Sequence, residues 1–169
     1  MDSGLLLFRL LIGLLLVGHG SQKLFGSFGG GGIAGTGAFF EKVGFRPGRP
    51  MALVAGLTEA GPGLFLALGL LTRLSAAAVI GTLLVAGWTF AAKGLWAQKG
   101  GYELCLLYGG AGAVLALTGP GAYSLDAALG IGGSSWLGVG AIALGLASGA
   151  VVIARATRTK KADALRAGV

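Results

Sequence analysis

Five long apolar stretches constrain the fold of this chain more than any other feature. They cover residues 4–22, 51–71, 74–93, 102–117 and 135–154. A helix that crosses a bilayer needs about 20 mostly apolar residues, because each residue adds ~1.5 Å and the hydrocarbon layer is about 30 Å thick. The fourth stretch is short and needs its flanks to reach across. The pattern predicts an all-α, polytopic membrane protein.

The composition agrees with this prediction. Charged residues make up 11% of the chain, whereas an ordinary soluble domain has about 25%. The 35 glycines suit close helix packing in lipid, and Ala141, Gly145 and Gly149 form a stripe of small residues in the fifth stretch. A net charge of +7 would suggest nucleic acid as a partner of a soluble protein. Because the basic residues lie in connections and at the C-terminus, we expect the lipid bilayer as the partner and no nucleic acid.

The positions of the basic residues predict the orientation of the chain. With five spans, the connections at 23–50 and 94–101 and the C-terminal tail lie on one side of the membrane. These segments and their borders carry most of the basic side chains: Lys23, Lys42, Arg46, Arg49, Lys93, Lys99, Arg155, Arg158, Lys160, Lys161 and Arg166. Since basic residues favour the cytoplasmic side, we expect the N-terminus outside and the tail in the cytoplasm. Within the first connection, "GTGAFFEKVGF" predicts a short amphipathic helix at the interface.

A carboxylate at membrane depth is the polar group that most needs an explanation. Glu59 lies about 12 Å below the side that carries the first connection, by the rise of a helix. An unpaired carboxylate in lipid is costly and needs a partner, a proton or water. His19 and Arg9 lie about 7–8 Å from Glu59 along the membrane normal. Either side chain is therefore a candidate partner.

Other polar and aromatic groups gather toward the same side. His19, Gln22 and Lys23 stand at i, i+3 and i+4 and share one helix face, and Glu103 opens the fourth stretch there. If the helices form a bundle, these groups meet. The predicted ligand pocket is lined by His19, Gln22, Lys23, Glu59, Trp96, Tyr102 and Glu103.

Most of the polar residues also have a structural interpretation. Lys23 suits an interfacial anchor and Arg9 a side chain that snorkels to the outer headgroups. We assign structural roles to Arg73, in the tight "LTRL" turn, and to Asp126. One histidine and one cysteine cannot build a conventional zinc or bis-histidine haem site. We therefore expect neither a metal nor a covalently bound cofactor, and no residue is assigned a catalytic role.

Several segments resemble the DoxX family of bacterial membrane proteins. In order across residues 5–129 they read "RLLIGLLLVGHGSQKLFGSFGG", "GTGAFFEKVGF", "LVAGLTEAGPGLFLALGLLTRL", "GGYELCLLYGGAGAVLAL" and "TGPGAYSLDAAL". The resemblance implies a four-helix transmembrane core over residues 1–130 in a bacterial plasma membrane. Residues 131–169, a fifth helix and a basic cytoplasmic tail, exceed the short family members. The family is similar to the DoxD subunit of thiosulfate:quinone oxidoreductase, and some members are associated with redox-defence complexes.

The resemblance and the polar groups together suggest two functions. In the first, the chain is a quinone-interacting subunit of a membrane oxidoreductase. His19 and Gln22 then donate hydrogen bonds to the quinone, Glu59 or Glu103 relays protons, an aromatic residue flanks the ring, and a partner supplies electrons. In the second, the chain is an accessory or scaffold subunit of a respiratory or redox-defence complex, docked through its fifth helix. A small-solute transporter is a further alternative, although no internal repeat favours it.

The predicted orientation can be tested with a reporter enzyme that is active only outside the cytoplasm. Fused to the C-terminus, the reporter is expected to be inactive, and fused to the N-terminus it is expected to be active. Activity of the C-terminal fusion in intact cells would contradict the orientation.

Overall fold

The computed structural model describes residues 2–166, which form helices and turns but no strand. The predicted all-α fold is confirmed. The longer helices are α1 (Asp2–Phe25), α2 (Gly32–Lys42), α3 (Gly48–Leu68), α4 (Thr72–Phe90), α5 (Glu103–Thr118) and α7 (Ser135–Arg166). Shorter helical turns are η1 (Ser27–Gly29), η2 (Ala91–Lys93), η3 (Ala97–Lys99) and α6 (Leu125–Ala128). Met1 of the predicted core and residues 167–169 of the predicted tail lie outside the described residues.

Within residues 2–166, four helices are long and apolar enough to cross a membrane: α1, α3, α4 with η2 (Thr72–Lys93), and α7. The fourth apolar stretch does not extend into its flanks. It forms α5, whose 16 residues span about 24 Å at ~1.5 Å per residue, less than the hydrocarbon layer. Gly119, with a φ of 78°, follows the end of this helix. By contrast, α7 continues past its apolar stretch without a break as far as Arg166.

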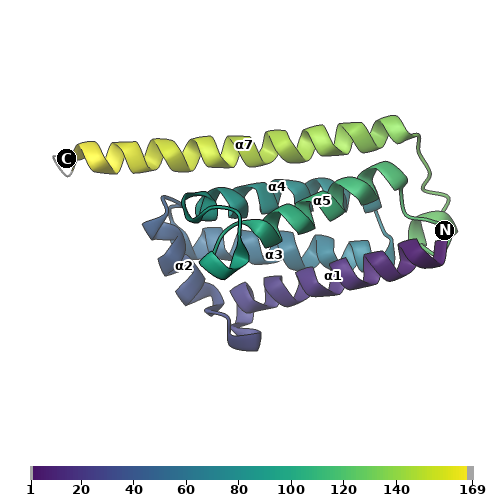
Figure 1. Ribbon diagram of the computed structural model, residues 1–169, viewed down its shortest axis with the longest axis horizontal. Coiled ribbons are helices and arrows are strands. Elements are labelled where there is room, and N and C mark those ends of the chain that lie inside the picture. Colours follow the sequence, from purple (N-terminus) through teal and green to yellow (C-terminus); the bar gives the residue numbers. More distant parts are fainter. Residues whose placement is uncertain (1, 167–169) are drawn as a thin grey trace.

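The five longest helices run side by side and alternate in direction along the chain (Figure 1). They are α1, α3, α4, α5 and α7. α1 packs mainly on α3, whereas α7 lies as an outer layer against α4 and α5. The first connection, the third connection and the C-terminal part of α7 share one end of the bundle (Figure 1). We call this the basic end and define it as residues 23–47, 91–102 and 155–166. The N-terminus, the turn between α3 and α4, and α6 lie at the opposite end.

Glycine lets two pairs of helices pack backbone to backbone. A Cβ added to Gly13 of α1 would lie 2.4 Å from the carbonyl oxygen of Gly63 in α3. A Cβ added to Gly145 of α7 would lie 2.6 Å from the carbonyl oxygen of Ala77 in α4. The small-residue stripe of the fifth helix is thus buried against its own chain. A subunit that docks through the fifth helix, as the second suggested function expects, cannot use this face, because α4 already occupies it.

Arg9 lies at the end opposite the basic end, and its side chain is fully buried. The guanidinium donates hydrogen bonds to the carbonyl oxygen of Pro120 at 2.5 Å and to that of Tyr123. It therefore joins α1 to the segment before α6. Arg9 neither snorkels to headgroups nor pairs with Glu59, since the chain supplies backbone acceptors at its own depth.

Asp126 of α6 fixes the turn between α3 and α4. Its buried carboxylate accepts hydrogen bonds from the backbone N–H groups of Leu71, at 2.7 Å, and Thr72, at 2.9 Å. These bonds satisfy N–H groups that the start of α4 would leave unpaired. Arg73 donates to the carbonyl oxygen of Gly133 at 2.9 Å, which ties the same turn to the start of α7.

The contact between α1 and α3 can be tested by adding one methyl group. Gly13→Ala is expected to lower the free energy of unfolding by about 1–3 kcal/mol, because overpacking forces the backbones apart. Gly18→Ala in the same helix is the matched control, since a Cβ there has nothing within 4 Å. Thermal unfolding in detergent micelles measures both. Equal stability of the two variants would contradict the close packing.

Candidate functional site

A cavity of about 880 Å³ lies at the basic end of the bundle. Helices α2, α3, α4 and α7 contribute most of its lining, and the last turns of α1 reach its floor. The walls are mainly apolar: side chains that line them include Phe39, Phe40, Phe45, Met51, Val54 and Val85. Pockets of about 300–1,000 Å³ with apolar walls and a few polar groups are typical sites for small molecules.

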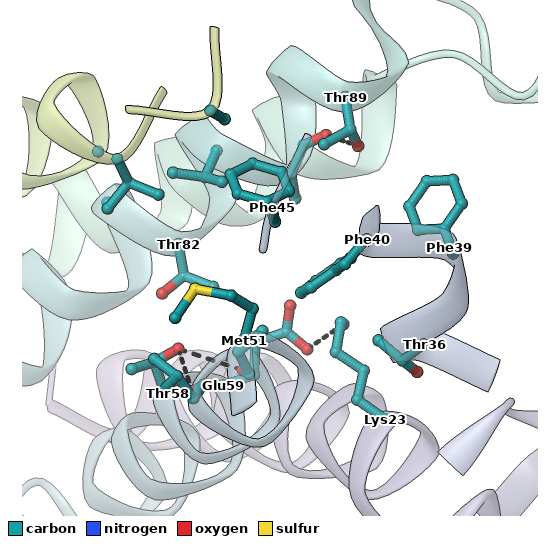
Figure 2. A pocket seen from close by; sticks show the side chains of 18 of the residues that line it. Lys23, Thr36, Phe39, Phe40, Phe45, Met51, Thr58, Glu59, Thr82 and Thr89 are labelled. Carbon is teal, nitrogen blue, oxygen red and sulfur yellow. Dashed lines mark hydrogen bonds and ion pairs between the residues drawn. The ribbon is translucent and has the colours of Figure 1, made fainter. Parts of the chain in front are cut away.

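The cavity meets a buried ion pair between α1 and α3. The Lys23 ammonium donates a hydrogen bond to Oε2 of Glu59, as Figure 2 shows. Glu59 is 3% exposed, while Lys23 is partly exposed and lies in the last turn of α1. Removing one partner of such a pair leaves an uncompensated charge, which is strongly unfavourable in a medium of low dielectric constant.

The second carboxylate oxygen of Glu59 faces the cavity. Among the residues that the structure describes, Glu59 is bonded to Lys23 through Oε2 only, and Oε1 has no hydrogen-bond partner. Figure 2 shows it turned toward the space between Phe40, Phe45 and Thr82. Glu59 therefore presents a hydrogen-bond acceptor to whatever occupies that space.

Threonine side chains are among the other polar groups that line the cavity. Thr58 donates its hydroxyl proton to the carbonyl oxygens of its own helix, at 2.9 Å from that of Val54. Thr89 does the same in α4, at 2.7 Å from the carbonyl oxygen of Ala86. Both hydroxyl oxygens remain acceptors. Thr82 makes no hydrogen bond within the described residues, so its hydroxyl is free to donate or accept.

Lys23, and not His19 or Arg9, is the partner of Glu59. Nδ1 of His19 instead lies 3.1 Å from Oε1 of Gln22, and its ring meets the edge of Tyr108 with a centroid distance of 5.5 Å. The prediction was wrong because it compared the depths of Cα atoms. The long Lys23 side chain carries its ammonium away from its own Cα toward α3.

Three of the predicted pocket residues line the cavity: Gln22, Lys23 and Glu59. The others lie elsewhere at the basic end. Glu103 accepts a hydrogen bond from the backbone N–H of Ala97 at 2.8 Å and so fastens the third connection. Trp96 is exposed, and Tyr102 precedes α5; neither they nor His19 border the cavity.

Aromatic residues of the first connection form a wall that the sequence did not reveal as part of a site. Phe45 is buried, with its ring 5.4 Å from that of Phe40 and 5.9 Å from that of Trp88. The segment "GTGAFFEKVGF" does form the predicted short helix, α2. It was expected at the lipid interface, yet Phe40 turns inward and lines the cavity.

The fifth helix also borders the cavity, through Val152, Arg155 and Thr159 among others. Its basic extension is held to the first connection by an ion pair between Arg46 and Asp163 at 3.1 Å. The described residues contain no group of three or more His, Cys, Asp or Glu side chains placed to hold a metal ion.

The model of the DoxX family matches residues 4–92, more than half of the chain. The chain belongs to the DoxX family. A second family model, described as "TQO small subunit DoxD", matches residues 50–155.

A curated relative supports the membership. The "Inner membrane protein YqjF" of Escherichia coli (strain K12) is 35% identical over 128 residues, which is 74% of this chain and 91% of the relative. No solved structure matches the chain significantly. This DoxX-family chain is accordingly a multi-pass membrane protein, similar to a protein of a bacterial inner membrane.

The ion pair generates a prediction about stability. Lys23→Met is expected to lower the free energy of unfolding by about 3 kcal/mol, because it strands the buried charge of Glu59. The double variant Lys23→Met/Glu59→Leu should recover most of the loss, since apolar replacement of both partners is often neutral. Lys99→Met, at an exposed position, is the control. If thermal unfolding shows the same stability for Lys23→Met as for Lys99→Met, that result would contradict the ion pair.

Proposed function

We propose that this DoxX-family chain is an accessory membrane subunit of an oxidoreductase complex and binds a quinone in the cavity at the basic end. The observation that carries the proposal is the joining of a mostly apolar cavity to the Lys23–Glu59 pair. A match to a family described as a "small subunit" supports a place within a complex. Electrons come from a partner of that complex.

The chemistry of the cavity suits the parts of a quinone. A lysine ammonium has three donors, and Lys23 uses one of them on Glu59, which leaves donors for a ring oxygen. The aromatic faces of Phe40 and Phe45 can flank the ring. Valines on three helices, Val54, Val85 and Val152, offer an apolar path for an isoprenoid tail.

A purely structural subunit accounts less well for these features. Replacing a buried ion pair by apolar residues is often neutral or stabilising, so stability alone gives no reason to bury Lys23 against Glu59. A purely structural role also gives no reason for an acceptor oxygen of Glu59 that faces an open cavity. A ligand with polar atoms accounts for both.

Filling the cavity tests the proposal. In Val85→Trp, the indole occupies the space of the ligand, and the quinone that co-purifies from native membranes in mild detergent is expected to fall at least about tenfold. Val139→Trp adds the same volume on α7 at an exposed position outside the cavity and should leave the quinone content unchanged. Quinone is measured in lipid extracts by mass spectrometry.

Two results would contradict the proposal. One is a wild-type preparation that carries no quinone and binds no added short-tail benzoquinone. The other is quinone that remains in Val85→Trp at the level of Val139→Trp while both proteins stay folded.

A further inference from the structure

The Glu59 oxygen that faces the cavity, Oε1, can favour one redox form of a bound quinone over the other. We propose that the site prefers the reduced form, the quinol, whose hydroxyl groups donate hydrogen bonds, over the oxidised form, which has only carbonyl acceptors. This inference rests on the proposed function and adds selectivity to it. It concerns binding alone and invokes no electron transfer by this chain.

Glu59 is the first reason for the preference. Glu59 forms an ion pair with Lys23, and a carboxylate in such a pair accepts hydrogen bonds but does not donate them. Glu59 is 3% exposed and lines the cavity, so a ligand that fills the cavity would cut its free oxygen off from water. A quinone carbonyl placed there would set two acceptors against each other, whereas a quinol hydroxyl would satisfy the carboxylate with a charge-assisted hydrogen bond.

The neighbouring threonines point the same way. The hydroxyl protons of Thr58 and Thr89 are engaged by backbone carbonyl oxygens. Each therefore offers only an acceptor to a ligand. Thr58 and Thr89 thus add acceptors to the cavity wall, while its donors are the Lys23 ammonium, the hydroxyls of Thr36 and Thr82, and the guanidinium groups of Arg46 and Arg155.

A quinol suits this arrangement because each of its hydroxyl groups can both donate and accept hydrogen bonds. One hydroxyl can donate to Oε1 of Glu59, and its oxygen can still accept from Lys23. The other can donate to a threonine oxygen of the cavity lining. An oxidised quinone can accept from Lys23 and Thr82 but cannot donate, so it would leave the Glu59 oxygen unpaired and cut off from water, which carries a cost.

The test compares the two redox forms of one short-tail benzoquinone on the purified full-length protein. Binding is measured without oxygen, so that the quinol stays reduced, by quenching of intrinsic tryptophan fluorescence. Wild type is expected to bind the quinol at least about tenfold more tightly than the quinone. This comparison needs no variant and decides the matter even if substitutions at Glu59 impair folding.

A variant assigns the preference to Glu59. Glu59→Gln replaces the charged acceptor by an amide that can donate to a carbonyl, so the ratio of affinities is expected to fall to near one. Glu103→Gln removes a carboxylate at the same end of the bundle but outside the cavity, and should keep the wild-type ratio.

The outcomes separate this inference from the proposed function. Quinone binding that equals or exceeds quinol binding in wild type overturns the preference and leaves the proposed function standing. A ratio that persists in Glu59→Gln shows that Glu59 does not set it and overturns the assignment. Failure of both forms to bind overturns the proposed function and this inference together.

Discussion

The ion pair between Lys23 and Glu59 is the interaction on which the functional part of the structure depends. It forms because glycines bring α1 and α3 together along their length, at Gly13 and Gly63 and again near Gly20 and Gly56. Once the helices are this close, the Lys23 side chain at the end of α1 brings its ammonium to the carboxylate of Glu59, which lies near the middle of α3. The ammonium of Lys23 stabilises the carboxylate of Glu59 at a depth where an unpaired charge would be too costly.

The same contact organises the surroundings of the pair. α2 and the loop after it fold back over the end of α1 and α3, and Phe45 closes the space by packing on Trp88 of α4. α7 then lies along α4 and borders the cavity from the outside. The fifth helix thus belongs to the site as well as to the bundle, although it lies beyond the four-helix core that the resemblance implies.

The sequence predicted the helices well and the contacts between side chains poorly. Hydropathy located every long helix. Backbone groups in lipid must hydrogen-bond within the protein, so apolar stretches of this length form helices. Hydropathy missed the extension of α7 to Arg166, since a polar helix that leaves the membrane carries no apolar signal. Glu59 was identified from its cost in lipid, but its partner was not, because the reach of Lys23 and the direction of Phe40 depend on how helices pack. Phe45 stands in a loop, where periodicity gives no information.

The central claim is that a quinone occupies the cavity beside Lys23 and Glu59, and cross-linking with a photoreactive benzoquinone tests it most directly. The wild-type protein is labelled in native-like membranes, and the attachment sites are located by mass spectrometry of peptides. The account predicts labels within residues 36–59, on the aromatic wall and on α3, that are lost when excess unlabelled short-tail quinone competes. Labels confined to lipid-facing positions outside the cavity, or labels that do not respond to the competitor, would contradict it.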